Sequence, residues 1–184
     1  MFERYQEDAK RAIFFARWEA QRSGSAYIEP KHILLGLTRE ADSKANQLFA
    51  LSAHEETFRT QLGVSPSAQS SASVDLPLSN TSKRVLAYTA EEADRLASRP
   101  IGTEHLLVGL LREKQSDVPQ ALVKAGIDLR SARNRIRAAQ GLPIPDREPD
   151  DKEISLRPLR PFAGFALLVV VLSLFYLLVR LADS

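Results

Sequence analysis

The sequence contains no cysteine, and this absence excludes several kinds of site. Without a thiol there is no disulfide, no thiolate nucleophile, no Fe–S cluster and no Cys-based zinc site. The 3 histidines form no H-E-x-x-H motif, which excludes the common helical zinc-protease site. None of the 8 glycines precedes a lysine, so the Gly-Lys-Ser/Thr phosphate-binding loop is missing as well. We therefore expect no cofactor.

An excess of charge of one sign is also missing. The chain has 25 Lys and Arg against 23 Asp and Glu, for a formal net charge of +2. Such a small excess gives no electrostatic argument for nucleic acid as a partner. With 44% apolar residues in 184, the chain can build one domain of ordinary size or two small ones.

One long apolar run stands near the C-terminus, at residues 162–179, and reads FAGFALLVVVLSLFYLLV. As a helix it is about 27 Å long, close to the thickness of the hydrocarbon core of a bilayer. The alternative, a buried helix of a soluble domain, rarely stays apolar on every face over this length. The sequence therefore predicts one transmembrane helix. The residues expected to form and border this anchor are Phe162, Leu168, Leu174, Tyr176, Val179 and Arg180.

The charges around this run predict its orientation. The basic residues on its N-terminal side are Lys152, Arg157 and Arg160. Only Arg180 lies beyond it, so the positive-inside rule places residues 1–161 in the cytoplasm. Residues 1–11 are highly charged and lack the apolar stretch of a signal peptide. We expect a single-pass anchor in the cytoplasmic (inner) membrane, joined to the domain by a proline-rich spacer at residues 141–161.

An internal repeat occupies the rest of the chain. The segment IEPKHILLGLTRE at 28–40 matches IGTEHLLVGLLRE at 101–113, with seven of thirteen positions identical at an offset of 73. Two copies are too few for a solenoid, so a pseudo-two-fold pair that shares one core is expected. The predicted boundaries are 1–64 for the first repeat, 65–77 for a Ser-rich linker and 78–140 for the second repeat.

The first copy has the apolar spacing of helices. Its opening segment repeats at three- and four-residue intervals through Tyr5, Ala9, Ala12, Ala16 and Ala20. Phe14, Phe15 and Trp18 widen this face and are expected to lie mostly in the core, although one or two could be exposed in a partner-binding groove. Pro30 suits the first turn of a second helix, and two shorter helices are expected at 43–51 and 54–62.

The second copy repeats this plan. Ser79 or Asn80 opens its first helix, and Thr103 is the expected N-cap of the next. Pro119 lies in the first turn of a third helix, and Asp128 caps a fourth that ends near Gln140. No strand pattern is present. The predicted fold is all-α, a duplicated four-helix repeat with eight helices in pseudo-two-fold arrangement, followed by the transmembrane helix.

The motif at 101–113, its degenerate copy at 28–40 and the opening Met1-Phe2-Glu3-Arg4-Tyr5 resemble the Clp repeat. This repeat forms the N-terminal domain of ClpA/ClpC-like unfoldase ATPases, and the resemblance covers about residues 1–140. It implies an eight-helix receptor module that binds substrates, adaptors or, in some members, phosphorylated arginine. The ATPase modules of that family are absent from this sequence, where the spacer and the apolar run take their place. We therefore expect no ATP-driven unfolding by this chain.

The resemblance also implies a site for peptides or phosphoarginine. The family pocket uses the acid of the G-T-E-H motif, here Glu104, and a hydroxyl residue near the start of each copy, here Ser79. A carboxylate can pair with a guanidinium, and a hydroxyl can donate to a phosphate. The first copy has Lys31 and Gln6 at these positions, and Lys31 would repel a guanidinium. Alternatively, Glu104 is an acid favoured in a first turn by the helix dipole.

His32 and His105 occupy matching positions in the two copies. A residue duplicated together with a fold more often serves the fold, so we expect both to form hydrogen bonds at a helix N-terminus. The alternative is an enzyme that uses His105 and Glu104. Neither histidine has a nucleophile and a carboxylate near it at a recognisable spacing.

Arg130, Arg133 and Arg137 recur on one face of the last expected helix. An arginine face can contact nucleic acid or anionic lipid headgroups. More commonly it is solvated, and the sequence predicts a solvated face here.

The sequence therefore favours a non-catalytic, membrane-anchored binding module. It would recruit substrate proteins or adaptors at the cytoplasmic face of the membrane, where tethering raises the local concentration of what it binds. The alternative is a regulator or membrane recruiter of a Clp ATPase or protease machine that acts through its adaptors. The expected partners are proteins or peptides, and the membrane through the C-terminal helix.

Overall fold

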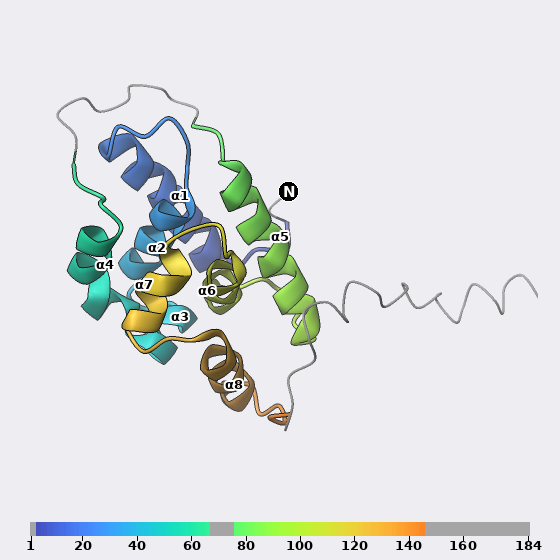
Figure 1. The fold of residues 1–184 in the computed structure, drawn as a ribbon. Helices are drawn as coiled ribbons and strands as arrows, with labels where there is room; N and C mark the ends of the chain where they lie inside the picture. The colour runs from blue at the N-terminus through green and yellow to red at the C-terminus, as the bar shows by residue number, and fades with distance from the viewer. Residues whose placement is uncertain (1–2, 67–75, 146–184) are drawn as a thin grey trace, which may run out of the picture. The chain divides into compact units, whose positions relative to one another are not determined.

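The structure is a computed structural model that describes residues 3–66 and 76–145 (Figure 1). The first copy contains α1 (Glu7–Arg22), α2 (Pro30–Arg39), α3 (Lys44–Phe49), the 3-10 helix η1 (Leu51–His54) and α4 (Glu55–Gln61). The second contains α5 (Asn80–Arg95), α6 (Thr103–Arg112), α7 (Val118–Lys124) and α8 (Leu129–Ala139). Within these ranges there are no strands beyond two isolated bridges, so the predicted all-α, eight-helix fold is confirmed there.

The predicted transmembrane helix at residues 162–179 lies outside the described residues. In the two described ranges, none of the helices has both the length and the apolar character needed to cross a bilayer. The described helices belong to one compact unit, Met1–Ile144.

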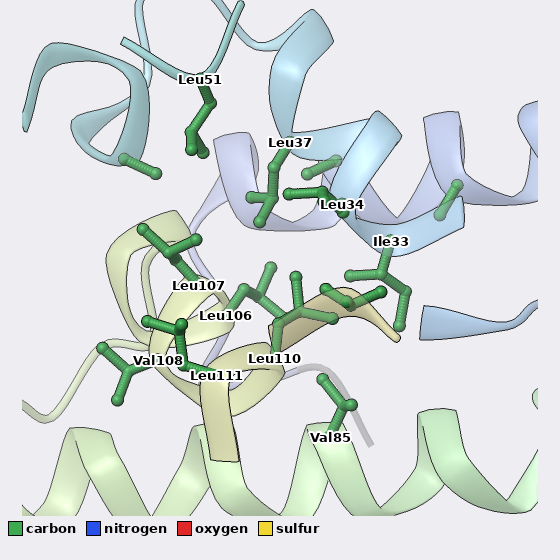
Figure 2. Close-up of a cluster of buried hydrophobic side chains, with 14 of the residues drawn as sticks. Ile33, Leu34, Leu37, Leu51, Val85, Leu106, Leu107, Val108, Leu110 and Leu111 are labelled. Carbon is green, nitrogen blue, oxygen red and sulfur yellow. The ribbon is translucent and has the colours of Figure 1, made fainter. Parts of the chain in front are cut away.

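The two helices that carry the repeated motif form the centre of this unit. Nearly every residue of α2 and α6 is buried, because these helices are apolar on most of their surface. Helix α1 packs on α2, and α5 packs on α6. Figure 2 shows side chains of the two central helices pointing toward one another, among them Ile33 and Leu37 of α2 and Leu106 and Leu110 of α6. One core therefore joins the two copies.

Helix α1 faces α2 through small side chains. Ala9, Ala12, Ala16 and Ala20 are fully buried, as their spacing predicts. A Cβ placed on Gly36 of α2 would fall on the carbonyl oxygen of Ala12, so the two backbones are in close contact. This approach leaves no room for large side chains between the helices.

The expectation that the aromatic residues of α1 lie mostly in the core is wrong for two of them. Phe14 is 65% exposed and Trp18 is 38% exposed. Phe14 is two positions from both Ala12 and Ala16, which at about 100° per residue places it on the far side of the helix. The alanine stripe takes the core side, and the large rings face outward.

The two copies exchange their leading segments. The isolated bridges are parallel and join Tyr5 to Ile101 and Ile28 to Leu78. The Gln6 amide donates to the Ile101 carbonyl at 2.9 Å, and the Ser79 amide donates to the Ile28 carbonyl at 3.0 Å. At the offset of 73 residues, Gln6 corresponds to Ser79 and Ile28 to Ile101, so the two bonds are equivalent in the two copies. The start of each copy is therefore tied to the entry of the central helix of the other copy, as a pseudo-two-fold arrangement requires.

Several predicted helix ends are confirmed, and two need correction. Ser79 and Asp128 are N-caps, and Pro30 and Pro119 lie in first turns. Helix α3 ends at Phe49 rather than near residue 51, because Ala50 adopts a left-handed conformation with φ 49° before η1 begins. The N-cap of α6 is Gly102 and not Thr103. The hydroxyl of Thr103 instead accepts a hydrogen bond from the Ala45 amide of the other copy, at 3.1 Å.

A buried carboxylate, Glu19, holds the helices of the first copy together. Its side chain is 1% exposed and accepts hydrogen bonds from Arg39 at 2.8 Å and from Arg59 at 2.6 and 2.9 Å. Burial alone would raise the pKa of Glu19, but the hydrogen bonds from Arg59 and Arg39 outweigh burial and lower it. The carboxylate is thus kept ionised as the link between α1, α2 and α4.

The second copy repeats this network around Glu92. Arg112 donates to the Glu92 carboxylate at 3.1 Å, and Arg133 of α8 donates at 2.6 and 2.9 Å. Arg133 and Arg137 are buried, so the expectation of a solvated arginine face on α8 is wrong for both. The apolar face of α8 packs on the core, and Arg133 lies beside it with Glu92 as its partner.

Candidate functional site

Glu104 lies in the first turn of α6 and is almost fully buried, with 2% exposure. Its Oε1 is 3.2 Å from the ammonium nitrogen of Lys44, which begins α3 in the other copy. Its Oε2 finds no hydrogen-bond partner among the described residues. Lys44 is 37% exposed in its side chain. A guanidinium ligand that reaches Glu104 has to compete with this ammonium group for the carboxylate.

The second predicted site residue, Ser79, belongs to a different neighbourhood. Its hydroxyl accepts from the Ser82 amide at 3.0 Å as the N-cap of α5, and its amide bonds to Ile28. The residue that reaches the entry of α6 is Gln6. A Cβ placed on Gly102 would fall against the Glu104 carboxylate and 2.7 Å from Gln6 Oε1. The leading segment of the first copy thus brings Gln6 close to Glu104, and α3 of that copy brings Lys44. Sequence reasoning missed both neighbours.

The related place in the first copy is a small polar pocket of about 300 Å³ at the entry of α2. Its lining residues are Glu29, Pro30, Lys31, Leu62, Thr81, Gln115, Ser116, Asp117 and Val118. Lys31 holds the position of Glu104 and pairs with Glu29 at 2.9 Å. The charge at this position of the motif is therefore reversed between the copies, and the pocket with Lys31 does not suit a guanidinium.

His105 and His32 have the structural role that their duplication predicts. The Nδ1 atom of His105 accepts a hydrogen bond from the Gly102 amide at 3.0 Å, and that of His32 accepts from the Glu29 amide at 3.0 Å. Both rings are fully buried and cap a central helix. The ring of His105 is thus shielded from any substrate. Among residues 3–66 and 76–145, no group of three His, Asp or Glu side chains could hold a metal ion.

The buried histidines predict a stability that depends on pH. Burial lowers the pKa of His32 from its usual 6.5 to about 4, and burial also lowers the pKa of His105. Below pH 6.5 a histidine in the unfolded chain binds a proton, whereas the buried ring in the folded chain stays neutral. The free energy of unfolding is therefore highest above pH 6.5 and falls as the pH approaches 4, by about 3 kcal/mol for His32 alone.

Urea unfolding at a series of pH values measures this effect. In His32→Gln the slope between pH 6.5 and 4.5 should flatten, because the amide oxygen can still accept the Glu29 amide but does not titrate. Any contribution of Glu19 lies below its usual pKa of 4.5, since its pKa is lowered in the folded state. A wild-type curve that stays flat from pH 7 to 4.5 would contradict the assignment.

An apolar groove with a volume of about 490 Å³ lies along α1. Its apolar lining consists of Ile13 and Phe14 of α1 together with Ile28, Leu76 and Leu78. Two cationic side chains, Lys10 and Arg17, complete the lining. Concave apolar surfaces of this size commonly mark binding sites.

Trp18 extends the exposed aromatic surface by one turn beyond Phe14. The guanidinium of Arg39 lies 4.3 Å from the centre of its ring, and that of Arg22 lies 4.8 Å away. Cation–π contacts of this kind fix the ring in place while leaving part of it open to solvent. Tyr27, next to the groove residue Ile28, is 54% exposed.

The related face of α5 does not repeat this groove. At an offset of 73 residues, Phe14 corresponds to Ala87, Arg17 to Ala90 and Trp18 to Glu91. The duplication thus preserved the core and the buried networks in both copies, but the exposed Phe14 and Trp18 have no aromatic counterpart in the second copy, where the aromatic residue Tyr88 is partly buried beside Arg112. This asymmetry argues that the groove serves binding rather than the fold.

A family model described as the Clp repeat N-terminal domain matches residues 4–125 and again residues 77–158. Among curated relatives, a ClpA homolog from Porphyra purpurea, named as an ATP-binding subunit of the ATP-dependent Clp protease, is 33% identical over 138 residues. ClpC/MecB from Bacillus subtilis, named as a negative regulator of genetic competence, is 32% identical over 137 residues. Each match covers 74% of this chain but only 17% of the relative, so the chain spans about a sixth of their length.

Solved structures share the fold. The N-terminal domain of ClpD from Arabidopsis thaliana superposes with a TM-score of 0.60 and 23% identity, covering 77% of this chain and 97% of that domain. The N-terminal domain of Hsp104 from Candida albicans gives a TM-score of 0.61 and 14% identity, covering 77% of this chain and 95% of that domain. At these identities the likeness supports the helical architecture alone.

Proposed function

Because the chain belongs to the family of Clp repeat N-terminal domains, we propose that it is a non-catalytic module that binds substrate proteins or adaptors. The observation that carries this proposal is the apolar groove along α1. Phe14 lies at its edge with 65% of its surface open to solvent. Fully burying such a side chain against a partner is worth about 1.5–3 kcal/mol. Exposed aromatic residues beside a pocket are typical anchors of protein interfaces.

We place the primary site at this groove rather than at Glu104. The groove is open, whereas Glu104 is buried and paired with Lys44. A phosphoarginine or peptide site at Glu104 and Ser79 stays a prediction, and its ligand would have to compete with Lys44 for a buried carboxylate. An apolar side chain that enters the groove faces no such competition.

Photocrosslinking tests the proposed site. A photoreactive amino acid is placed at Phe14 or, as a matched control, at the related position Ala87 of the same 184-residue chain. We expect position 14 to form crosslinks with discrete proteins, and position 87 to form crosslinks with none of the same proteins. Phe14→Ala should weaken binding of the isolated partner about tenfold or more and leave the unfolding midpoint unchanged, because the ring is largely exposed.

The outcomes separate this proposal from its alternatives. If both positions give the same adducts, or if Phe14→Ala leaves the affinity for the partner unchanged, the binding surface lies elsewhere. Adducts made up only of Clp ATPase subunits or their adaptors would favour the second candidate, a regulator or recruiter of a Clp machine. That candidate is favoured by the curated relatives, which are named as subunits of such a machine.

We further propose that residues 162–179 anchor the module to the cytoplasmic membrane with the described domain in the cytoplasm. The uncharged length of this run and the basic residues before it support the proposal. Alkaline washing of isolated membranes tests it, since a spanning helix resists extraction and a peripheral protein does not. Release of the chain by this treatment would overturn the anchor and leave the groove unaffected.

A further inference from the structure

We propose that Trp18 is a second anchor for the protein that contacts Phe14, and that Arg22 and Arg39 are positioning residues that hold its ring. This inference rests on the proposed function, because it concerns the same partner on the same helix. It follows from the contacts of the Trp18 ring, from the buried carboxylate behind Arg39, and from the different form that this network takes in the second copy.

The Trp18 ring is in contact with two guanidinium groups. The Cζ atom of Arg39 lies 4.3 Å from the centre of the ring, and that of Arg22 lies 4.8 Å from it. Both distances are within the range of cation–π attraction. Trp18 is nevertheless 38% exposed, so a partner can reach the ring while the two cations hold it.

Arg39 is itself held from behind by a buried carboxylate. Its Nε donates to Oε1 of Glu19 at 2.8 Å, and its side chain is 29% exposed whereas that of Glu19 is 1% exposed. Arg59 donates to the same carboxylate at 2.6 and 2.9 Å, so Glu19 is fixed from two sides. A chain of contacts therefore runs from the buried carboxylate through Arg39 to the exposed ring.

The second copy has the same network with a carboxylate in the place of the ring. At the offset of 73 residues the corresponding members are Trp18 and Glu91, Glu19 and Glu92, and Arg39 and Arg112. Arg112 pairs with Glu91 at 2.9 Å and with Glu92 at 3.1 Å, and its side chain is only 7% exposed. A carboxylate at the position of Trp18 is therefore compatible with the fold.

The arginine that follows one turn later also differs between the copies. Arg95 corresponds to Arg22, and its Nε lies 3.6 Å from the Glu92 carboxylate. Arg22 lies over the Trp18 ring instead. The first copy thus keeps its buried ion pairs and adds an exposed aromatic side chain where the second copy has an acid. Since either residue satisfies the fold, contact with a partner accounts for the ring.

Trp18 lies on the surface that the proposed partner covers. It follows Phe14 by four positions, and residues at this spacing are neighbours on one face of a helix. Tryptophan is among the residues most often found at the energetic centre of protein interfaces. A ring that is held in place before binding loses little freedom when the partner arrives, which lowers the cost of association. Arg22 and Arg39 therefore add to the affinity through Trp18.

Time-resolved fluorescence anisotropy tests the positioning role in the free chain. Trp18 is the 1 tryptophan of the sequence, so the emission reports on this ring alone. We expect rotation of the whole domain to dominate the decay in the wild type. A fast local component should appear in Arg22→Gln and in Arg39→Lys, which keeps a charge beside Glu19 but lacks the planar guanidinium. A fast component in the wild type, or none in either variant, would overturn the positioning role.

The matched control is Arg112→Lys. This substitution alters the related network of the second copy, where the guanidinium stacks on Tyr88 at 4.4 Å. We expect it to leave both the anisotropy decay of Trp18 and the binding of the partner unchanged. Urea unfolding of each variant checks that the fold is kept.

The protein recovered from the crosslink at position 14, purified and labelled, is the probe for binding to the 184-residue chain. Trp18→Glu gives the first copy the acid of the second, so its unfolding midpoint should be kept. We expect it to weaken binding about tenfold or more. Arg39→Lys should weaken binding roughly 2- to 10-fold, and so should Arg22→Gln, which leaves the ion pairs of Glu19 intact.

The outcomes distinguish failure of the inference from failure of the proposed function. If Phe14→Ala weakens binding but neither Trp18→Glu nor Arg22→Gln does, the groove binds protein and the inference is overturned. If no crosslink forms at position 14, the proposed function fails and the inference fails with it. If Trp18→Glu abolishes binding to vesicles of anionic lipid and leaves the crosslinks at position 14 unchanged, the ring contacts a membrane and the inference is overturned.

Discussion

Replacing Glu92 with glutamine is expected to lower the free energy of unfolding by about 3–5 kcal/mol. The Glu92 carboxylate is fully buried and accepts hydrogen bonds from Arg112 and Arg133. Arg95 lies 3.6 Å away and is itself nearly buried. An amide removes the negative charge that these guanidinium groups share in a region of low dielectric constant. Loss of one member of a buried ion network is costly for this reason.

Urea unfolding followed by circular dichroism measures this loss. The matched control is Glu91→Gln, one residue earlier, where the carboxylate is 54% exposed and pairs with the same Arg112 at 2.9 Å. An exposed pair contributes at most about 1 kcal/mol, so the two variants should differ severalfold. Equal effects of the two substitutions would show that Glu92 is solvated in the folded chain. Glu19→Gln should behave like Glu92→Gln, since Arg39 and Arg59 surround Glu19 in the same way.

The repeat and the helices could be predicted because they depend on local spacing. The alanine stripe of α1, the proline in the first turn of α2 and the cap at Asp128 each act within a few residues. The helix-capping role of His32 and His105 followed from their matching positions. All of these features are recorded in short stretches of sequence, and the structure agrees with them.

The composition of the site could not be predicted in the same way. Ser79 and Glu104 are expected to act together because they belong to one copy. The bridges between residues 5 and 101 and between 28 and 78 instead place the leading segment of each copy beside the central helix of the other copy. Which copy supplies a neighbour is decided by the packing of the whole domain.

The position of the large side chains raised a similar problem. Periodicity placed Phe14 and Trp18 next to the buried stripe, since apolar character alone does not say which side of a helix faces the core. Gly36 determines which side of α1 faces the core. Because Gly36 has no side chain, the backbones of α1 and α2 lie in close contact, and only small residues of α1 fit between them. The buried state of Arg133 was also recorded in the repeat. Glu19 and Arg59 recur as Glu92 and Arg133, which is the pattern of a conserved ion pair within one chain.

Gly36→Ala is expected to lower the free energy of unfolding by about 3 kcal/mol, or to prevent folding. The added methyl group would fall on the carbonyl oxygen of Ala12 and 2.8 Å from the amide nitrogen of Ala16. Both atoms belong to the backbone of α1, so no side-chain rotation relieves the overlap. The helices would have to move apart and lose contact along the whole alanine stripe. This penalty has to exceed the gain of about 1 kcal/mol that alanine brings to a helix.

Alanine substitutions at two further glycines allow the loss of unfolding free energy to be ranked by urea unfolding. A Cβ on Gly109 would meet the rotatable hydroxyl of Thr89 but also the Val85 carbonyl oxygen at 2.7 Å, so Gly109→Ala should cost less than Gly36→Ala. Gly63→Ala meets nothing within 4 Å, and its φ of +62° limits the cost to about 1–2 kcal/mol of backbone strain. If Gly36→Ala instead stabilised the chain, helix propensity would outweigh contact, and α1 and α2 could not be packed backbone against backbone. The groove on the outer face of α1 depends on that packing, because Phe14 faces solvent only while the alanine face is held against α2.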